Sequence, residues 1–96
     1  MSTQKEYVEK LTAQMREWDA EIEQLKDKAA YAIPARKQEY AQAIAPLVRK
    51  RNEAAVQLKE IAAAGSGEWK ELKEGAEQTW NEVKTILHNA LSTFRH

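Results

Sequence analysis

The sequence predicts an all-α protein, and three observations support that fold class. Apolar side chains recur every three to four residues along nearly the whole chain, as they do on one face of a helix. Thr3 and Glu6 have the spacing of a capping box, which marks the start of a helix. A clear stop and restart occurs in AAAGSGEW, residues 62–69. Together these features predict a helical hairpin that forms a coiled-coil-like bundle.

The size and composition fit a single all-helical domain covering residues 1–96. Charged residues make up 31% of the chain, hydrophobic residues make up 43%, and the formal net charge is zero. The absence of cysteine excludes disulfides and thiolate chemistry. The first ten residues do not have the pattern of a secretory signal, and no apolar run approaches the roughly 18 residues of a spanning helix. We therefore expect a cytoplasmic protein.

The first predicted helix is long, from about residue 3 to about residue 63. Its apolar residues stay in one band about 100° wide, and the band keeps its phase beyond Pro34 and Pro46. The residues beside Pro34 include no Gly or Asn to end a helix and no Ser, Thr or Asp to start one. We therefore expect a kink at Pro34, which costs a helix about 3 kcal/mol, rather than a reversal of the chain.

The alternative is a three-helix bundle with a bend near Pro34. Arg36 occupies a position in the apolar band and leaves the band empty between Ile33 and Tyr40. A bend would expose Arg36 to water, whereas in a straight helix its side chain must extend to reach the solvent. Three segments of nearly equal length would also suit a bundle. The sequence leaves this alternative open.

The second predicted helix follows a turn at residues 64–67 and runs from about residue 67 to about residue 94. Gly65 suits the left-handed position that ends a helix, and Ser66 suits the N-cap of the next. So short a turn implies two antiparallel helices. We expect Arg51 to stack on Trp80 in the hairpin core. The predicted hairpin core consists of Tyr40, Ile44, Leu47, Arg51, Leu58, Trp69, Leu72, Trp80, Val83, Leu87 and Phe94.

The beginning of the long helix has no partner within this hairpin. A second helix of about 28 residues covers only its own length of the first, roughly residues 37–64. Residues 1–27 carry a net charge of 4 − 7 = −3, and residues 28–64 carry 7 − 3 = +4. Two antiparallel copies would align these opposite charges, although a chain that folds back at Pro34 would align them too. We expect an antiparallel homodimer. Its predicted self-association stripe is Tyr7, Leu11, Met15, Trp18, Ile22 and Leu25.

No residue pattern predicts a catalytic, cofactor or metal site, and we expect no enzyme. His88 lies on the polar face of the second helix and His96 is the last residue, whereas a tight metal site needs three or four converging ligands. The acidic residues between Glu17 and Asp27 lack the Gly-containing loop of a calcium site. The basic run at residues 49–51 points in different directions around a helix, with no neighbouring aromatic residue, so nucleic-acid binding is not expected.

The three tryptophans lie on the apolar bands of the predicted helices, at Trp18, Trp69 and Trp80. Tryptophans on amphipathic helices can anchor a protein in a membrane interface, but such helices usually carry a Lys- and Arg-rich polar face. Here the polar faces mix both signs of charge. Packing in a core or interface is therefore favoured over binding to a membrane or granule surface.

The opening MSTQKEYVEKLTAQMREWDAEIEQLKDKA, the Ala-, Lys- and Glu-rich middle and the segment GSGEWKELKEGAEQTWNEVK resemble a family of small bacterial coiled-coil stress-response proteins. The resemblance covers most of the chain and implies a non-enzymatic bacterial protein linked to stress. It implies no functional residues. Pro34 and Pro46 depart from the unbroken helix expected of that family.

The favoured function is therefore that of a structural or interaction protein that self-associates through amphipathic helices. An alternative is a protein that binds a lipid or polymer-granule surface by opening its bundle and exposing the Trp-bearing faces. A third hypothesis is an adaptor whose exposed stripe receives a helix of another protein.

Overall fold

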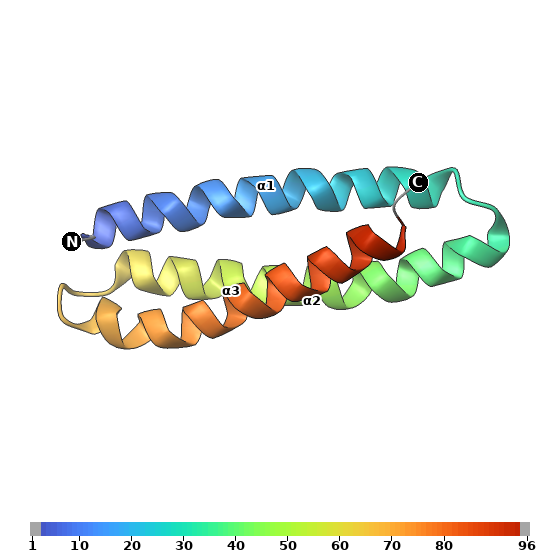
Figure 1. Cartoon of the computed structure of the whole chain (residues 1–96). Coiled ribbons are helices and arrows are strands. Elements are labelled where there is room, and N and C mark those ends of the chain that lie inside the picture. Colours follow the sequence, from blue (N-terminus) through green and yellow to red (C-terminus); the bar gives the residue numbers. More distant parts are fainter. Residues whose placement is uncertain (1–2, 95–96) are drawn as a thin grey trace.

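The structure, a computed structural model, describes residues 3–94. It contains three helices, α1 (Gln4–Ala30), α2 (Pro34–Ala63) and α3 (Glu68–Thr93). They run up, down and up along a bundle that measures 51 × 18 × 17 Å (Figure 1). The all-α class is confirmed, in the alternative form of a three-helix bundle. The prediction of one long helix from residue 3 to residue 63 is wrong, because the chain reverses at residues 31–33.

The reversal follows from the position of Pro34 as the first residue of α2. At that position a proline loses no intrahelical hydrogen bond, and its fixed φ already suits the helix. Ile33 is the N-cap, with φ −65° and ψ 155°, the extended conformation that a residue before proline prefers. The N–H of Ala32 donates to the carbonyl of Ala29 at 3.2 Å and closes the last turn of α1. Pro34 therefore starts a helix here and does not kink one.

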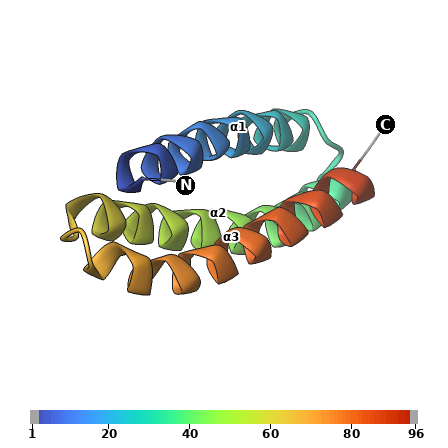
Figure 2. The ribbon, with the colours of Figure 1, turned by 60° about the vertical axis from the view of Figure 1, so that its left-hand side comes forward.

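The opposite end of the bundle holds the start of α1 and the turn between α2 and α3 (Figure 2). The Thr3 hydroxyl accepts a hydrogen bond from the Glu6 N–H at 3.1 Å, and the Glu6 carboxylate accepts one from the Thr3 N–H at 3.4 Å, so the predicted capping box is present. The side-chain amide of Gln4 donates to the carbonyls of Ile61 at 2.7 Å and Ala64 at 2.8 Å. These acceptors lie at the end of α2, where carbonyls lack the usual helical partner and where the Ile61 carbonyl also accepts the N–H of Ala64 at 3.3 Å.

The second turn occupies residues 64–67, between the end of α2 and the start of α3. The Gly65 carbonyl accepts the N–H groups of Glu68 at 3.1 Å and Trp69 at 3.2 Å. No glycine among residues 3–94 has a positive φ, so the left-handed conformation expected at Gly65 is not used. The N-cap of α3 is Gly67 rather than Ser66.

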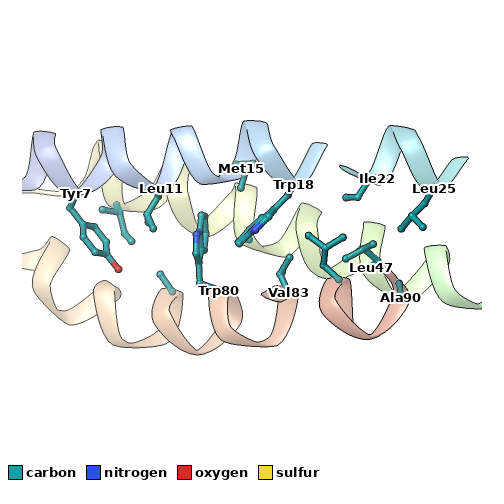
Figure 3. Close-up of a cluster of buried hydrophobic side chains, with 14 of the residues drawn as sticks. Tyr7, Leu11, Met15, Trp18, Ile22, Leu25, Leu47, Trp80, Val83 and Ala90 are labelled. Atoms are coloured by element: carbon teal, nitrogen blue, oxygen red, sulfur yellow. The ribbon is translucent and has the colours of Figure 1, made fainter. Parts of the chain in front are cut away.

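The core lies along the axis of the bundle and contains side chains of all three helices (Figure 3). Helices α1 and α3 each approach α2 more closely than they approach each other. Small buried residues, Ala54 and Ala76, suit close packing of α2 and α3. Large aromatic pairs span the wider distance between α1 and α3. Their ring centroids are 5.6 Å apart for Tyr7 and Trp69 and 4.8 Å apart for Trp18 and Trp80.

The predicted self-association stripe is buried inside the single chain, because α1 packs against its own α2 and α3. The reason for expecting an antiparallel homodimer, an apolar row without cover, therefore no longer applies. The buried stripe comprises Tyr7, Leu11, Met15, Trp18, Ile22 and Leu25.

Most of the predicted hairpin core is buried: Tyr40, Leu47, Trp69, Trp80, Val83, Leu87 and Phe94. Ile44 and Leu58 are half-buried against this core. Leu72 is 38% exposed and does not belong to the core. It lies at the edge of the contact between α2 and α3, in a shallow groove with Gln57 and Glu60.

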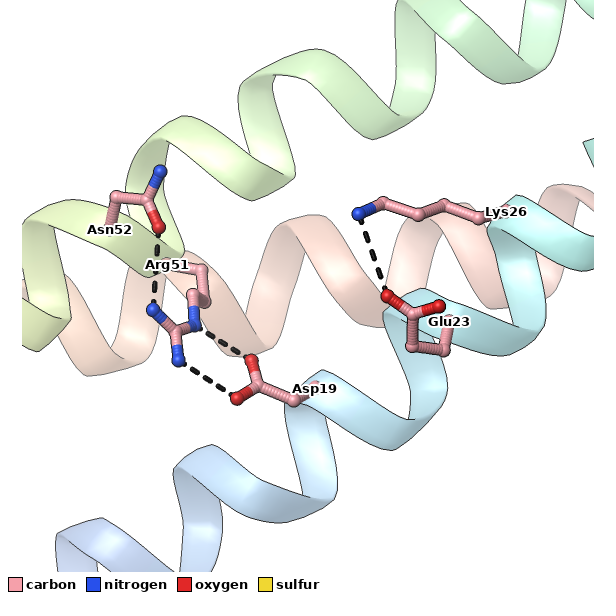
Figure 4. Close-up of polar contacts among 5 residues, drawn as sticks. All are labelled: Asp19, Glu23, Lys26, Arg51 and Asn52. Atoms are coloured by element: carbon pink, nitrogen blue, oxygen red, sulfur yellow. Dashed lines mark hydrogen bonds and ion pairs between the residues drawn. The ribbon is translucent and has the colours of Figure 1, made fainter.

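The prediction that Arg51 stacks on Trp80 is wrong. Arg51 pairs instead with Asp19 of α1 (Figure 4). Its Nε donates to Asp19 Oδ1 at 2.7 Å and its Nη2 donates to Oδ2 at 2.8 Å. Helix α1 carries a net charge of 5 − 7 = −2 and α2 carries 6 − 3 = +3. The alignment of opposite charges that suggested a dimer therefore occurs within one chain.

Candidate interaction surface

Among residues 3–94, no group of three or more His, Asp or Glu side chains is arranged to hold a metal ion. His88 is exposed on α3, the acidic residues from Glu17 to Asp27 are distributed along α1, and His96 lies outside the described residues. In the same part of the chain, no helix combines the length and the apolar character needed to cross a bilayer. The candidate binding site described below is a set of exposed side chains on the surface of the bundle.

The most apolar part of that surface is the corner between α1 and α2. Residues 29–35, AAYAIPA, contain no polar side-chain group except the Tyr31 hydroxyl. Tyr31 is 91% exposed and Ile33 is 65% exposed, the highest values among the exposed large apolar side chains described. Ala30, Pro34 and Ala35 are exposed beside them. The whole corner projects from one end of the bundle (Figure 1).

The folding of the chain does not account for these side chains. Ile33 is the N-cap of α2 but makes no capping hydrogen bond. Ser, Thr, Asn or Asp at an N-cap is worth about 1 kcal/mol more than a residue that cannot accept this bond. Tyr31 and Ile33 also leave most of their apolar surface in water. Places where a sequence departs from a local stability rule are often functional sites.

A shallow pocket of about 540 Å³ adjoins the corner and is lined by Asp27, Lys28, Tyr31, Ala32, Arg36, Tyr40 and Phe94. Two of these residues, Tyr40 and Phe94, line the pocket with stacked aromatic rings whose centroids are 3.9 Å apart. The Arg36 guanidinium lies 5.6 Å from the centroid of the Phe94 ring, a cation–π contact. The pocket thus combines aromatic surface with a net positive charge, since Lys28 and Arg36 outnumber Asp27 in its lining.

A second groove, of about 470 Å³, continues from Phe94 between α2 and α3. Its lining includes Ala43, Pro46, Ile86 and Ala90, together with polar side chains at the rim. The two hollows share Phe94, so the end of the bundle that carries the corner has more apolar surface than Tyr31 and Ile33 alone. We call this end, from the corner to Phe94, the apolar end.

A competing candidate is the groove of about 180 Å³ between α1 and α3. It is lined by Tyr7 and Trp80, whose Oη and Nε1 atoms are buried without a hydrogen-bond partner. Burial, and to a lesser degree the negative charge of Glu77, raises the pKa of Tyr7 above its usual value. Because both donor atoms are closed off from solvent, they cannot contact a molecule in this groove. We therefore interpret them as imperfect packing between α1 and α3.

The residues predicted from sequence as an interaction stripe belong to the core, and Trp18, Trp69 and Trp80 are all buried. The side chains that the structure leaves exposed for contact are Tyr31 and Ile33, which the sequence analysis did not identify. The signal was present as seven consecutive residues without a charge, amide or aliphatic hydroxyl. It was overlooked because these residues were assigned to the interior of a helix.

Comparisons with protein-family models, with curated proteins and with solved structures find no match to this chain. The resemblance to bacterial stress-response proteins therefore stays a prediction.

Proposed function

We propose that the protein is a non-enzymatic interaction protein that binds a lipid surface through the apolar end of its closed bundle. The observation that carries this proposal is the exposure of Tyr31 and Ile33 in a corner where capping residues would be more stable. Tyrosine suits a membrane interface, because its ring is apolar and its hydroxyl can remain hydrated. Isoleucine supplies an aliphatic side chain that can enter the acyl region.

This mode of binding differs from the opening of the bundle that the sequence suggested. The Trp-bearing faces are the core of the folded chain, and exposing them would give up the packing of Trp18 on Trp80. The corner is already exposed and needs no rearrangement. Binding through it leaves all three helices in place.

The expected affinity is modest. Burying a large apolar side chain fully is worth about 1.5–3 kcal/mol, and the corner offers two of them. Ordering at the interface reduces this gain. Anchors of this size give reversible membrane binding, which is strengthened by a second attraction.

Co-sedimentation with lipid vesicles tests the proposal. The Tyr31→Ser and Ile33→Ser double variant should lose most of the binding, because both inserted side chains are gone. Val56→Ser is a control, since Val56 is also an exposed β-branched residue, 58% exposed in the last third of α2 and away from the corner. It should bind like the unmodified chain.

The folding of these variants separates a binding effect from a structural one. Serine is a favoured N-cap, so Ile33→Ser should hold or raise the stability of the bundle while it weakens binding. Equal binding by the corner variant and the Val56 variant would refute the proposal. Binding to polymer granules without binding to vesicles would refute the lipid surface and favour a granule surface.

Self-association is a second candidate, and the observation that favours it is the apolar band that keeps its phase across the corner. Two chains could join α1 and α2 into one helix each and exchange their α1 helices. Pro34 opposes this arrangement, because a helix that runs through it loses about 3 kcal/mol. A link to bacterial stress rests on the sequence resemblance alone.

A further inference from the structure

We infer that the surface bound by the apolar end is anionic and that the bundle docks on it end-on. This inference rests on the proposed function and specifies its partner. The supporting observation is an uneven distribution of charge along a chain whose net charge is zero. Residues 26–37, around the corner, carry 4 − 1 = +3. Residues 60–71, an equal number around the second turn, carry 1 − 3 = −2.

The positive charges surround the apolar corner on both sides. Lys26 and Lys28 lie in the last turns of α1, and Arg36 and Lys37 lie in the first turn of α2. Lys26 is 3.6 Å from Glu23, and Arg36 is 3.5 Å from Glu39. These two basic residues are therefore partly neutralised, and residues 23–39, which include both partner carboxylates, carry 4 − 3 = +1.

Lys28 and Lys37 are the two remaining basic side chains at this end, and Asp27 is an exposed carboxylate beside Lys28. Within residues 3–94, neither forms an ion pair with a carboxylate, and both are exposed. The ammonium group of Lys28 makes one long hydrogen bond, 3.5 Å, to the carbonyl of Phe94. Both lysines are therefore placed to contact acidic head groups when the corner enters a bilayer.

The bundle is long enough to keep the charges at its two ends electrostatically independent. The long axis measures 51 Å, whereas electrostatic interactions are screened over about 8–10 Å at physiological salt. In an end-on orientation the acidic residues around the second turn lie several screening lengths from the surface, so an anionic surface repels them only weakly. A side-on orientation through the face that α1 and α3 share would bring two acidic helices toward the lipid, since each carries a net charge of −2, from 5 − 7 and 3 − 5. A side-on orientation through α2 would present a net charge of 6 − 3 = +3 but would leave Tyr31 and Ile33 at the end of the bundle out of the bilayer.

The experiment compares vesicles of phosphatidylcholine with vesicles in which part of that lipid is replaced by phosphatidylserine. Each basic residue near an anionic surface strengthens binding roughly fivefold. The Lys28→Gln and Lys37→Gln double variant should therefore bind the anionic vesicles roughly thirtyfold more weakly. Lys59→Gln with Lys70→Gln is the matched control, because it changes the net charge equally at the other end of the bundle. Its binding should be unchanged, and added salt should weaken binding of the unmodified chain.

The outcomes distinguish this inference from the proposed function. Equal binding to both kinds of vesicle, with loss in the Tyr31 and Ile33 variant, would support the proposed function and overturn the anionic preference. Equal weakening by the two lysine variants would show that net charge drives binding, which overturns end-on docking. An absence of binding to either vesicle would overturn both proposals.

Discussion

The two connections of the bundle both reverse the direction of the chain, but one is polar and the other is apolar. The turn at residues 64–67 is polar, holds two glycines and accepts hydrogen bonds from α3 and from the Gln4 side chain. The corner at residues 31–33 is apolar, has no side-chain cap and leaves Tyr31 and Ile33 in water. Folding alone therefore explains the first connection. The second contains a departure from folding rules that contact with an external surface would explain.

Substitution of the two prolines should change the free energy of unfolding more than any other change considered for the two connections. Pro46 lies inside α2, where it removes a hydrogen bond, so Pro46→Ala should stabilise the bundle by up to about 3 kcal/mol. Pro34 begins α2 and suits that position, so Pro34→Ala should not stabilise the closed monomer. Denaturant unfolding measures both free energies.

The same pair of variants tests the tendency to exchange helices. Pro34→Ala removes the penalty of about 3 kcal/mol on a helix that runs through the corner, so it should raise the dimer fraction at high concentration. Pro46→Ala should leave the mass measured by light scattering unchanged. A dimer that forms equally in both variants would show that the corner does not control folding back.

Gln4→Ala should have the next largest effect, at the other connection. It removes two hydrogen bonds that join α1 to the end of α2, and we expect a loss of about 1–2 kcal/mol in unfolding free energy. Gln38→Ala is the control near the corner, because Gln38 is exposed on α2 and makes no side-chain hydrogen bond within residues 3–94. A negligible effect of Gln4→Ala would remove the contrast between the two connections.

Tyr7→Phe should produce a smaller change of opposite sign. The Tyr7 hydroxyl is buried without a partner, so its removal should stabilise the bundle by about 1 kcal/mol. Burial raises the pKa of Tyr7 above 10.0, so the neutral phenol is favoured in the folded state. The contribution of this pKa shift to the free energy of unfolding is present below pH 10 and is lost as the pH rises through the pKa of the folded state. The unmodified chain should therefore lose more stability above pH 10 than the Phe variant; identical pH profiles would contradict the burial of this hydroxyl.

Much of the fold can be inferred from the sequence, because helix periodicity and the Thr3 capping box are local signals. The reversal at Pro34 was missed because proline is read differently inside a helix and at its first position, and only tertiary packing decides between them. Arg51 was misassigned for a related reason. Its partner, Asp19, comes within reach only when α1 folds back. The Gln4 contact likewise joins residues 57 and 60 positions apart, which no local pattern reveals.

The exposed corner was missed for a different reason. An apolar run is normally a sign of burial, and residues 29–35 look like core until the chain is folded. Once the corner is placed, the same run becomes an exposed end. The composition of the run was readable from the sequence, but its exposure was not.

Fluorescence can measure whether the corner enters a lipid surface. The chain has no cysteine, so a single introduced cysteine can carry a polarity-sensitive fluorophore. Ala35→Cys places the label beside the apolar corner, and Ser66→Cys places it in the exposed second turn. With anionic vesicles, we predict a blue shift and brighter emission at position 35 and no change at position 66. A shift at position 66 alone, equal shifts at both positions, or no shift at either would contradict it.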